Sequence, residues 1–193
     1  MAQLYTTGPA HIYLAFPTGS GTQNSPVYFG TCEDAPQVQI IPKFEDVYNS
    51  IGGTVPFDKS YQGEVALIDL DMNRYNESVY GILAARPRVG TRGVNIAGDV
   101  GTLMGTEGYT IGVYLKFDFG AAGAAPKAAY TANGMPPGYR FPGGIPIGPD
   151  RLQNLGTRPR KTNVVFFAIR IWNPATQAFG LYDFNLNGLP AIN

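Results

Sequence analysis

The chain has 193 residues with 25 glycines and 16 prolines, it is rich in tyrosine and phenylalanine, and its formal net charge is zero. That length allows one domain with a sizeable core, and the composition is typical of a β-rich protein with many turns. Zero net charge argues against a general nucleic-acid binder, the single cysteine excludes an intramolecular disulfide framework, and no apolar run is long enough to predict a membrane span.

The first residues, MAQLYTTGPA, contain neither a basic patch nor an apolar stretch of the kind that secretory signals have. We therefore expect the protein to be made and assembled in a cytoplasm.

Three strands are predicted in the first quarter of the chain. Residues 10–16 alternate, with Ile12 and Leu14 on one face and His11 and Tyr13 on the other. Residues 27–31 form a short second strand, and residues 37–41 alternate as a third.

Residues 43–62 mix charged and aromatic side chains around a Gly-Gly pair and have no obvious core face. Two interpretations stay open from the residues alone. The segment is either a hairpin that folds back on its own domain or an arm that buries its aromatic side chains against a neighbouring subunit. Those aromatic residues are Phe44, Tyr48, Phe57 and Tyr61.

A strand followed by a helix comes next. Residues 64–70 alternate as a strand, and Asp71 and Asn73 are residue types that cap helices well. Pro87 ends the helix, because proline disfavours helical geometry in the residue before it. The apolar face of the helix follows the spacing i, i+4, i+7, i+8, with Tyr75, Val79, Ile82 and Leu83.

Two further strands are predicted from alternation. Residues 110–119 place Ile111, Val113 and Leu115 inward and Tyr114 outward. Residues 163–172 form another strand, for which the inward set is Val165, Phe167, Ile169 and Ile171. A turn at residues 173–176 returns the chain as a closing hairpin over residues 177–184.

Residues 120–162 form a long insertion between these strands. Residues 120–148 are rich in Ala, Gly and Pro, a composition that cannot form a core of its own, so we expect an extended segment laid against a neighbour. The insertion ends in a basic patch, for which a solvated surface or pairing between subunits is favoured over phosphate binding. Its residues are Arg151, Arg158, Arg160 and Lys161.

No constellation of catalytic or metal-binding residues is found. The one histidine, His11, lies inside a predicted strand and is expected at its surface, and a zinc site would need several more nitrogen or sulfur ligands. Asp69 and Asp71 share a strand face, but helix capping accounts for Asp71 better than metal binding does. We expect a protein without enzymatic activity, metal or cofactor.

Charge is unevenly placed along the chain. Residues 32–77 carry nine acidic and three basic side chains, a net of −6, whereas residues 86–193 carry eleven basic and five acidic ones, a net of +6. Such halves can pair within one chain or between copies of it.

The order of these elements resembles that of phage tail tube proteins from long and contractile tails. The segment PQVQIIPKFEDVYNSIGGTVPFDKSYQGEVALIDLDMNRYN is similar to the family's strand, long hairpin arm, strand and helix. Residues 29–33 and the closing hairpin fit the same plan, so the resemblance covers residues 10–119 and 163–184, and the insertion matches nothing in it.

The resemblance implies a single domain over residues 1–193, mainly β, built as a β-sandwich or barrel with one flanking α-helix. It also implies hexameric rings that stack, an arm at residues 43–62 that contacts the adjacent subunit or ring, and a lumen that passes DNA as cargo. The expected function is therefore a virion tail tube subunit whose partners are copies of itself and other virion proteins.

Two alternatives remain. One is another virion structural protein, such as a capsid decoration, neck or baseplate component. The other is a β-sandwich carbohydrate-binding module that uses exposed tyrosines and Trp172.

Overall fold

The computed structural model describes residues 10–16, 26–32, 36–48, 56, 58–84, 110–117, 138–147, 162–173, 176–184, 186 and 189. Within these residues the protein is mainly β, as predicted, with one short helix. The strands are β1 (Ala10–Ala15), β2 (Val27–Cys32), β3 (Gln37–Val47), β4 (Asp58–Tyr75), β5 (Ile111–Phe117), β6 (Gly138–Pro146), β7 (Thr162–Ala168), β8 (Ile171–Asn173) and β9 (Ala178–Gly180).

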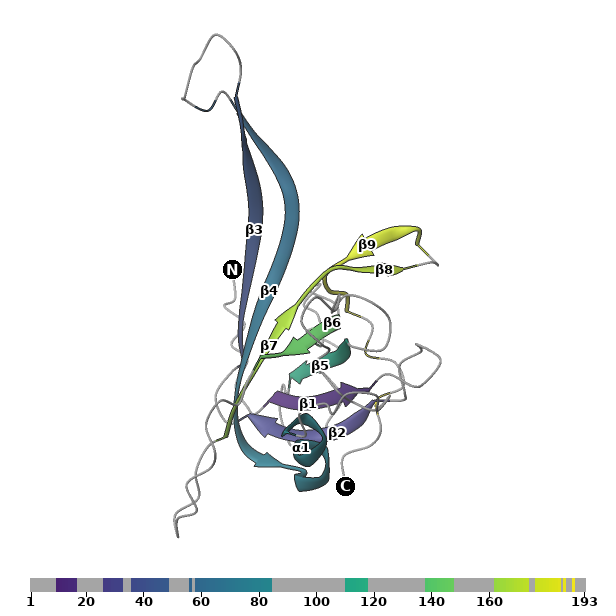
Figure 1. The fold of residues 1–193 in the computed structure, drawn as a ribbon. Helices are drawn as coiled ribbons and strands as arrows, with labels where there is room; N and C mark the ends of the chain where they lie inside the picture. Colours follow the sequence, from purple (N-terminus) through teal and green to yellow (C-terminus); the bar gives the residue numbers. More distant parts are fainter. Residues whose placement is uncertain are drawn as a thin grey trace, which may run out of the picture.

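Seven of these strands form one antiparallel sheet in the order β2-β1-β5-β6-β7-β4-β3, and β2 also pairs with β4. The extra pairing closes six of the strands into a barrel and leaves β3 attached to β4 alone among the described elements. β8 and β9 form a separate two-stranded sheet. Figure 1 shows the barrel with the β3–β4 hairpin extending far beyond it.

β4 is central to the fold because it is long enough to pair with three neighbouring strands. Its eighteen residues span roughly 60 Å at about 3.3 Å per residue. One edge pairs with β3 from Asp58 to Asp69 and then with β2 from Met72 to Tyr75. The opposite edge pairs with β7 from Ala66 to Met72. The strand predicted at residues 64–70 is therefore correct in type but too short.

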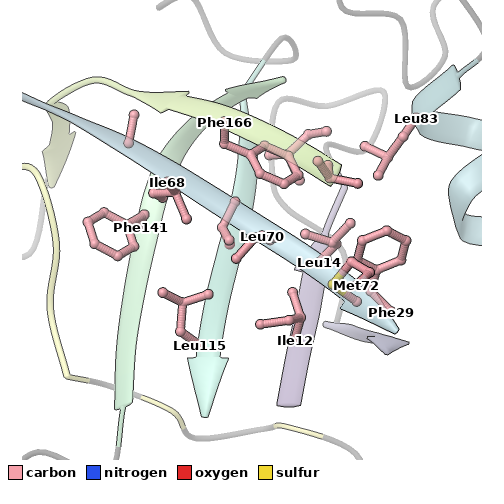
Figure 2. Packing of buried hydrophobic residues seen from close by; sticks show 14 of the residues in the cluster. Ile12, Leu14, Phe29, Ile68, Leu70, Met72, Leu83, Leu115, Phe141 and Phe166 are labelled. Carbon is pink, nitrogen blue, oxygen red and sulfur yellow. The ribbon is translucent and has the colours of Figure 1, made fainter. Parts of the chain in front are cut away.

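The barrel core is built from the inward face of each strand. In the interior, Ile68 and Leu70 of β4 pack in one cluster with Phe166, which is paired with Ile68 on the neighbouring strand β7, and with Leu115 of β5 (Figure 2). Ile12, Leu14, Phe29, Met72 and Phe141 lie in the same core and are all essentially inaccessible to solvent.

α1 (Glu77–Ala84) adds Val79 and Leu83 to this core, as its periodicity predicted. The predicted cap was wrong, because β4 continues as a strand through Asp71 and Asn73. The cap is Asn76, whose side-chain oxygen accepts hydrogen bonds from the amides of Ser78 (3.0 Å) and Val79 (3.4 Å). Pro87 lies outside the described residues.

The inward face of β7 is also opposite to the prediction. Val164 and Phe166 point inward, opposite Leu70 and Ile68 of β4, and Val165 and Phe167 lie on the outer face. Both faces of this strand are apolar, so the sequence alone does not determine which face points into the core. The pairing with β4 determines it. The strand ends at Ala168, and Ile171 begins β8 rather than continuing β7.

The prediction of an extended segment over residues 120–162 is wrong for residues 138–146. They form β6, which lies between β5 and β7 in the middle of the sheet. Gly144 makes this possible, because a Cβ there would lie 2.7 Å from Val113 Cγ2 and 2.8 Å from the carbonyl oxygen of Ile111. The remainder of that segment lies outside the described residues.

Part of the barrel's outer face is buried as well. Tyr13, Ala15 and Tyr114 form a second cluster, against which Tyr28, Leu186 and Leu189 pack. The outward orientation predicted for Tyr114 is correct, but Tyr114 is only 6% exposed. His11 is likewise only 5% exposed, so the expectation of a surface histidine is wrong.

Candidate interaction surface

The β3–β4 hairpin is regular almost to its tip, and we call its outer part, residues 43–62, the arm. Its register runs from Gln37 opposite Asp69 to Val47 opposite Asp58. The register shifts once, after Lys43, where Gln62 is the extra residue and Gly63 has a φ of 115°. A bulge with glycine at positive φ increases local twist, so it sets the direction in which the arm leaves the barrel.

Cross-strand contacts hold the arm together without help from the barrel. Lys59 pairs with Asp46 at 2.9 Å, and the side-chain amide of Gln62 donates to Glu45 at 3.0 Å. The hydrogen bond with Asp46 raises the pKa of Lys59 above its ordinary value. Cross-strand pairs of this kind favour one register over its slipped alternatives.

One face of the hairpin carries a row of exposed apolar side chains, which the Asp46–Lys59 ion pair interrupts between Phe44 and Tyr48. Val38 and Ile40 lie opposite Ile68 and Ala66, so they share the face that points into the core at the level of the barrel. Because side chains on β3 alternate, Phe44 continues this face outward. Its ring meets Tyr61 at 5.8 Å and 60°.

We call this row the stripe. Its members are Val38 (36% exposed), Ile40 (42%), Phe44 (55%), Tyr48 (56%) and Tyr61 (52%).

The stripe lies beside a free strand edge. Within the described residues β3 pairs only with β4, so its other edge presents unpaired backbone groups along eleven residues. Long exposed edges with apolar side chains are templates for pairing with another chain, and soluble monomers usually shorten or cover them. The described part of the arm therefore projects from the barrel and does not fold back on it (Figure 1).

Three of the four aromatic residues predicted for the arm surface, Phe44, Tyr48 and Tyr61, are exposed and belong to the stripe. Phe57 lies outside the described residues, as does the whole predicted basic patch of Arg151, Arg158, Arg160 and Lys161. The sequence reasoning missed Val38 and Ile40. Their alternation was visible, but it gave no sign that this part of β3 overhangs the barrel.

A second exposed aromatic group lies on the β8–β9 hairpin. Trp172 and Phe179 face each other across it, with ring centroids 5.1 Å apart and 49% and 56% of each residue exposed. Their rings are inclined at 62°, so they do not form the flat platform on which a sugar ring would stack.

The paired carboxylates of β4 have an ordinary structural partner. Asp69 and Asp71 both accept hydrogen bonds from the side-chain amide of Asn163 on β7, the second at 3.0 Å. Among the described residues no cluster of three or more metal-ligating side chains is present. None of their helices is long and apolar enough to cross a membrane.

Comparison with models of known protein families and with curated proteins finds no match to this chain.

Proposed function

We propose that this protein is a non-enzymatic structural subunit that assembles with copies of itself, and that the assembly is the tube of a phage tail. The observation that carries this proposal is the arm. A regular hairpin places an apolar stripe and an eleven-residue free edge outside the barrel that would otherwise bury such side chains.

Exposure of the stripe to water is energetically unfavourable in an isolated chain, and this supports a partner that covers it. Five large apolar residues remain between 36% and 56% exposed, although burying one such side chain contributes about 1.5–3 kcal/mol. A partner that covers the stripe recovers part of that free energy. In a structural protein the most available partner is another copy, present at the same concentration.

The tube assignment rests in addition on the resemblance in element order. The barrel, the long hairpin of β3 and β4 and the helix directly after β4 are the elements that this resemblance anticipates. In the proposed assembly, subunits form rings, the rings stack, and DNA passes through the lumen only as cargo.

The runner-up is another virion structural protein, a decoration, neck or baseplate component. The arm favours it equally, because such proteins also dock by projecting segments. The two differ in what the purified protein forms: a tube subunit propagates head to tail, whereas a decoration stops at a closed oligomer or stays monomeric until it meets its capsid.

Negative-stain electron microscopy of the purified protein, with mass determination by light scattering, tests the proposal. Hollow tubes or stacked rings are the expected result. A monomer or a small closed oligomer at every concentration would contradict the tube and leave the runner-up.

A further inference from the structure

The β8–β9 hairpin is a second projecting ribbon, separate from the barrel sheet. Trp172 and Phe179 are paired directly across it. A two-stranded hairpin is marginally stable by itself, and here its two largest side chains remain about half exposed. An exposed aromatic pair on such an element is the kind of surface that a partner stabilises.

Arg170 holds this hairpin in place at its root. Its guanidinium donates a 2.7 Å hydrogen bond to the carbonyl oxygen of Phe179. The same guanidinium lies next to the arm's bulge, because a Cβ at Gly63 would be 3.5 Å from Arg170 Nη1. The two hairpins therefore leave the barrel from adjoining positions, and both project from the same end of it (Figure 1).

The hairpins diverge from this root (Figure 1), and the aromatic contacts of each lie within its own ribbon. The stripe and the Trp172–Phe179 pair are thus two exposed aromatic surfaces that one chain keeps apart.

Their charges are complementary. Around the stripe, the described part of the hairpin carries acidic Glu45, Asp46, Asp58 and Glu64 against basic Lys43 and Lys59. Residues 169–180, which contain β8 and β9, have Arg170 as their only charged residue. The net-acidic arm is therefore attracted to a hairpin whose one charged residue, at its root, is basic, whereas two acidic arms repel each other.

We propose that the stripe of one copy packs against the Trp172–Phe179 pair of a neighbouring copy. This inference rests on the proposed function and names the surface that receives the arm. The contact is heterologous, because each copy supplies its arm to one neighbour and its β8–β9 hairpin to another. Since both hairpins leave the same end of the barrel, the contact joins copies that stand side by side, and it forms a ring when the rotation between neighbouring copies closes.

A heterologous contact can be tested by complementation. The arm variant Phe44→Ser/Tyr48→Ser keeps an intact β8–β9 hairpin, and the hairpin variant Trp172→Ser/Phe179→Ser keeps an intact arm. Each variant alone should remain monomeric at concentrations at least roughly 30-fold above those at which the wild type assembles, the effect of removing an interface hot spot of about 2 kcal/mol. Mixed one to one, they should form a heterodimer of twice the 20.7 kDa chain mass and nothing larger, because only one productive contact remains.

Val27→Ser is the matched control. Val27 is also an exposed apolar strand residue, at 40%, but it lies on neither hairpin, so this variant should assemble as the wild type does. Thermal melts of all variants verify that the barrel, which contains none of the substituted aromatic residues in its core, stays folded.

The outcomes separate the two proposals. A hairpin variant that assembles as the wild type does, or a mixture that stays monomeric while the wild type assembles, would overturn this contact and leave the proposed function standing. A wild type that never assembles would overturn both.

Discussion

Gly30 of β2 lies directly opposite Tyr75 of β4, where the barrel closes, and a Cβ at position 30 would stand 2.8 Å from the Tyr75 Cα. It would also overlap the carbonyl oxygen of Arg74. No rotation of a side chain relieves a clash with backbone, so only glycine allows β2 to approach β4 this closely.

Gly30→Ala should therefore destabilise the barrel, by about 1–3 kcal/mol or more, through forced separation of β2 from β4. Urea unfolding followed by circular dichroism measures the change. Gly180→Ala is the matched control, since a Cβ there meets nothing within 4 Å and should change stability by less than about 0.5 kcal/mol. Equal stability of the two variants would show that β2 and β4 are not in the close contact described.

Asn76→Ala should remove the cap of α1. Loss of the two bonds to the amides of Ser78 and Val79 is expected to cost about 1 kcal/mol, with a range of about 0.5–2 kcal/mol. Asn76→Asp keeps an oxygen acceptor and should retain most of the stability. If both substitutions proved neutral in urea unfolding, the helix start at Glu77 would have to be revised.

The covered outer cluster predicts a loss of stability at alkaline pH. Burial raises the pKa of Tyr114 above its ordinary value of 10.0, nearby Arg140 lowers it in part, and Asp183 adds to the rise. As pH increases beyond about 10, the unfolded chain releases this phenolic proton more readily than the folded protein does, so ionisation favours unfolding.

Stability contributed by the neutral phenol should thus be complete below pH 10 and decline as the pH rises through the folded-state pKa. Tyr114→Phe should weaken this decline, seen as a smaller fall in melting temperature between pH 9 and pH 11. Tyr61→Phe serves as control, because Tyr61 is 52% exposed and lies outside this cluster. The account of the cluster would be wrong if both variants lost stability as steeply as the wild type.

Alternation and residue type predicted the parts of the fold in which one phase is clearly apolar. β5 is the clearest example. Ile111, Val113 and Leu115 lie on one face, and the other face carries a single large apolar side chain, Tyr114. For β7 alternation predicted the wrong inward face, because residues 164–167 are apolar on both faces of the strand. Which face points inward depends on pairing with Ile68 and Leu70, about a hundred residues earlier.

The missed strand β6 has a different cause. Its glycines resemble a linker when only composition is considered, yet Gly143 and Gly144 bring backbone directly against neighbouring residues of the barrel. A Cβ at Gly143 would lie 2.8 Å from Ile171 Cγ1. Glycine that serves close packing and glycine that serves a flexible linker look alike in a sequence, and only the tertiary neighbours separate them.

The candidate site was predicted in part. Aromatic residues without a core face identified Phe44, Tyr48 and Tyr61 correctly as exposed. That Val38 and Ile40 join them depends on the length by which β3 and β4 overhang the barrel, which follows from the pairing of β4 with three strands rather than from any local pattern.

In the proposed assembly the arm joins copies of the chain, and removing its exposed aromatic residues tests this most directly. A deletion variant in which an Asn-Gly turn replaces residues 44–61 lacks Phe44, Tyr48 and Tyr61 and keeps the pairing of β4 with β2 and β7. Sedimentation velocity of the deletion variant beside the wild type should show large assemblies for the wild type and a folded monomer, with an unchanged thermal melt, for the variant. Assembly of the variant at wild-type concentrations would contradict the account.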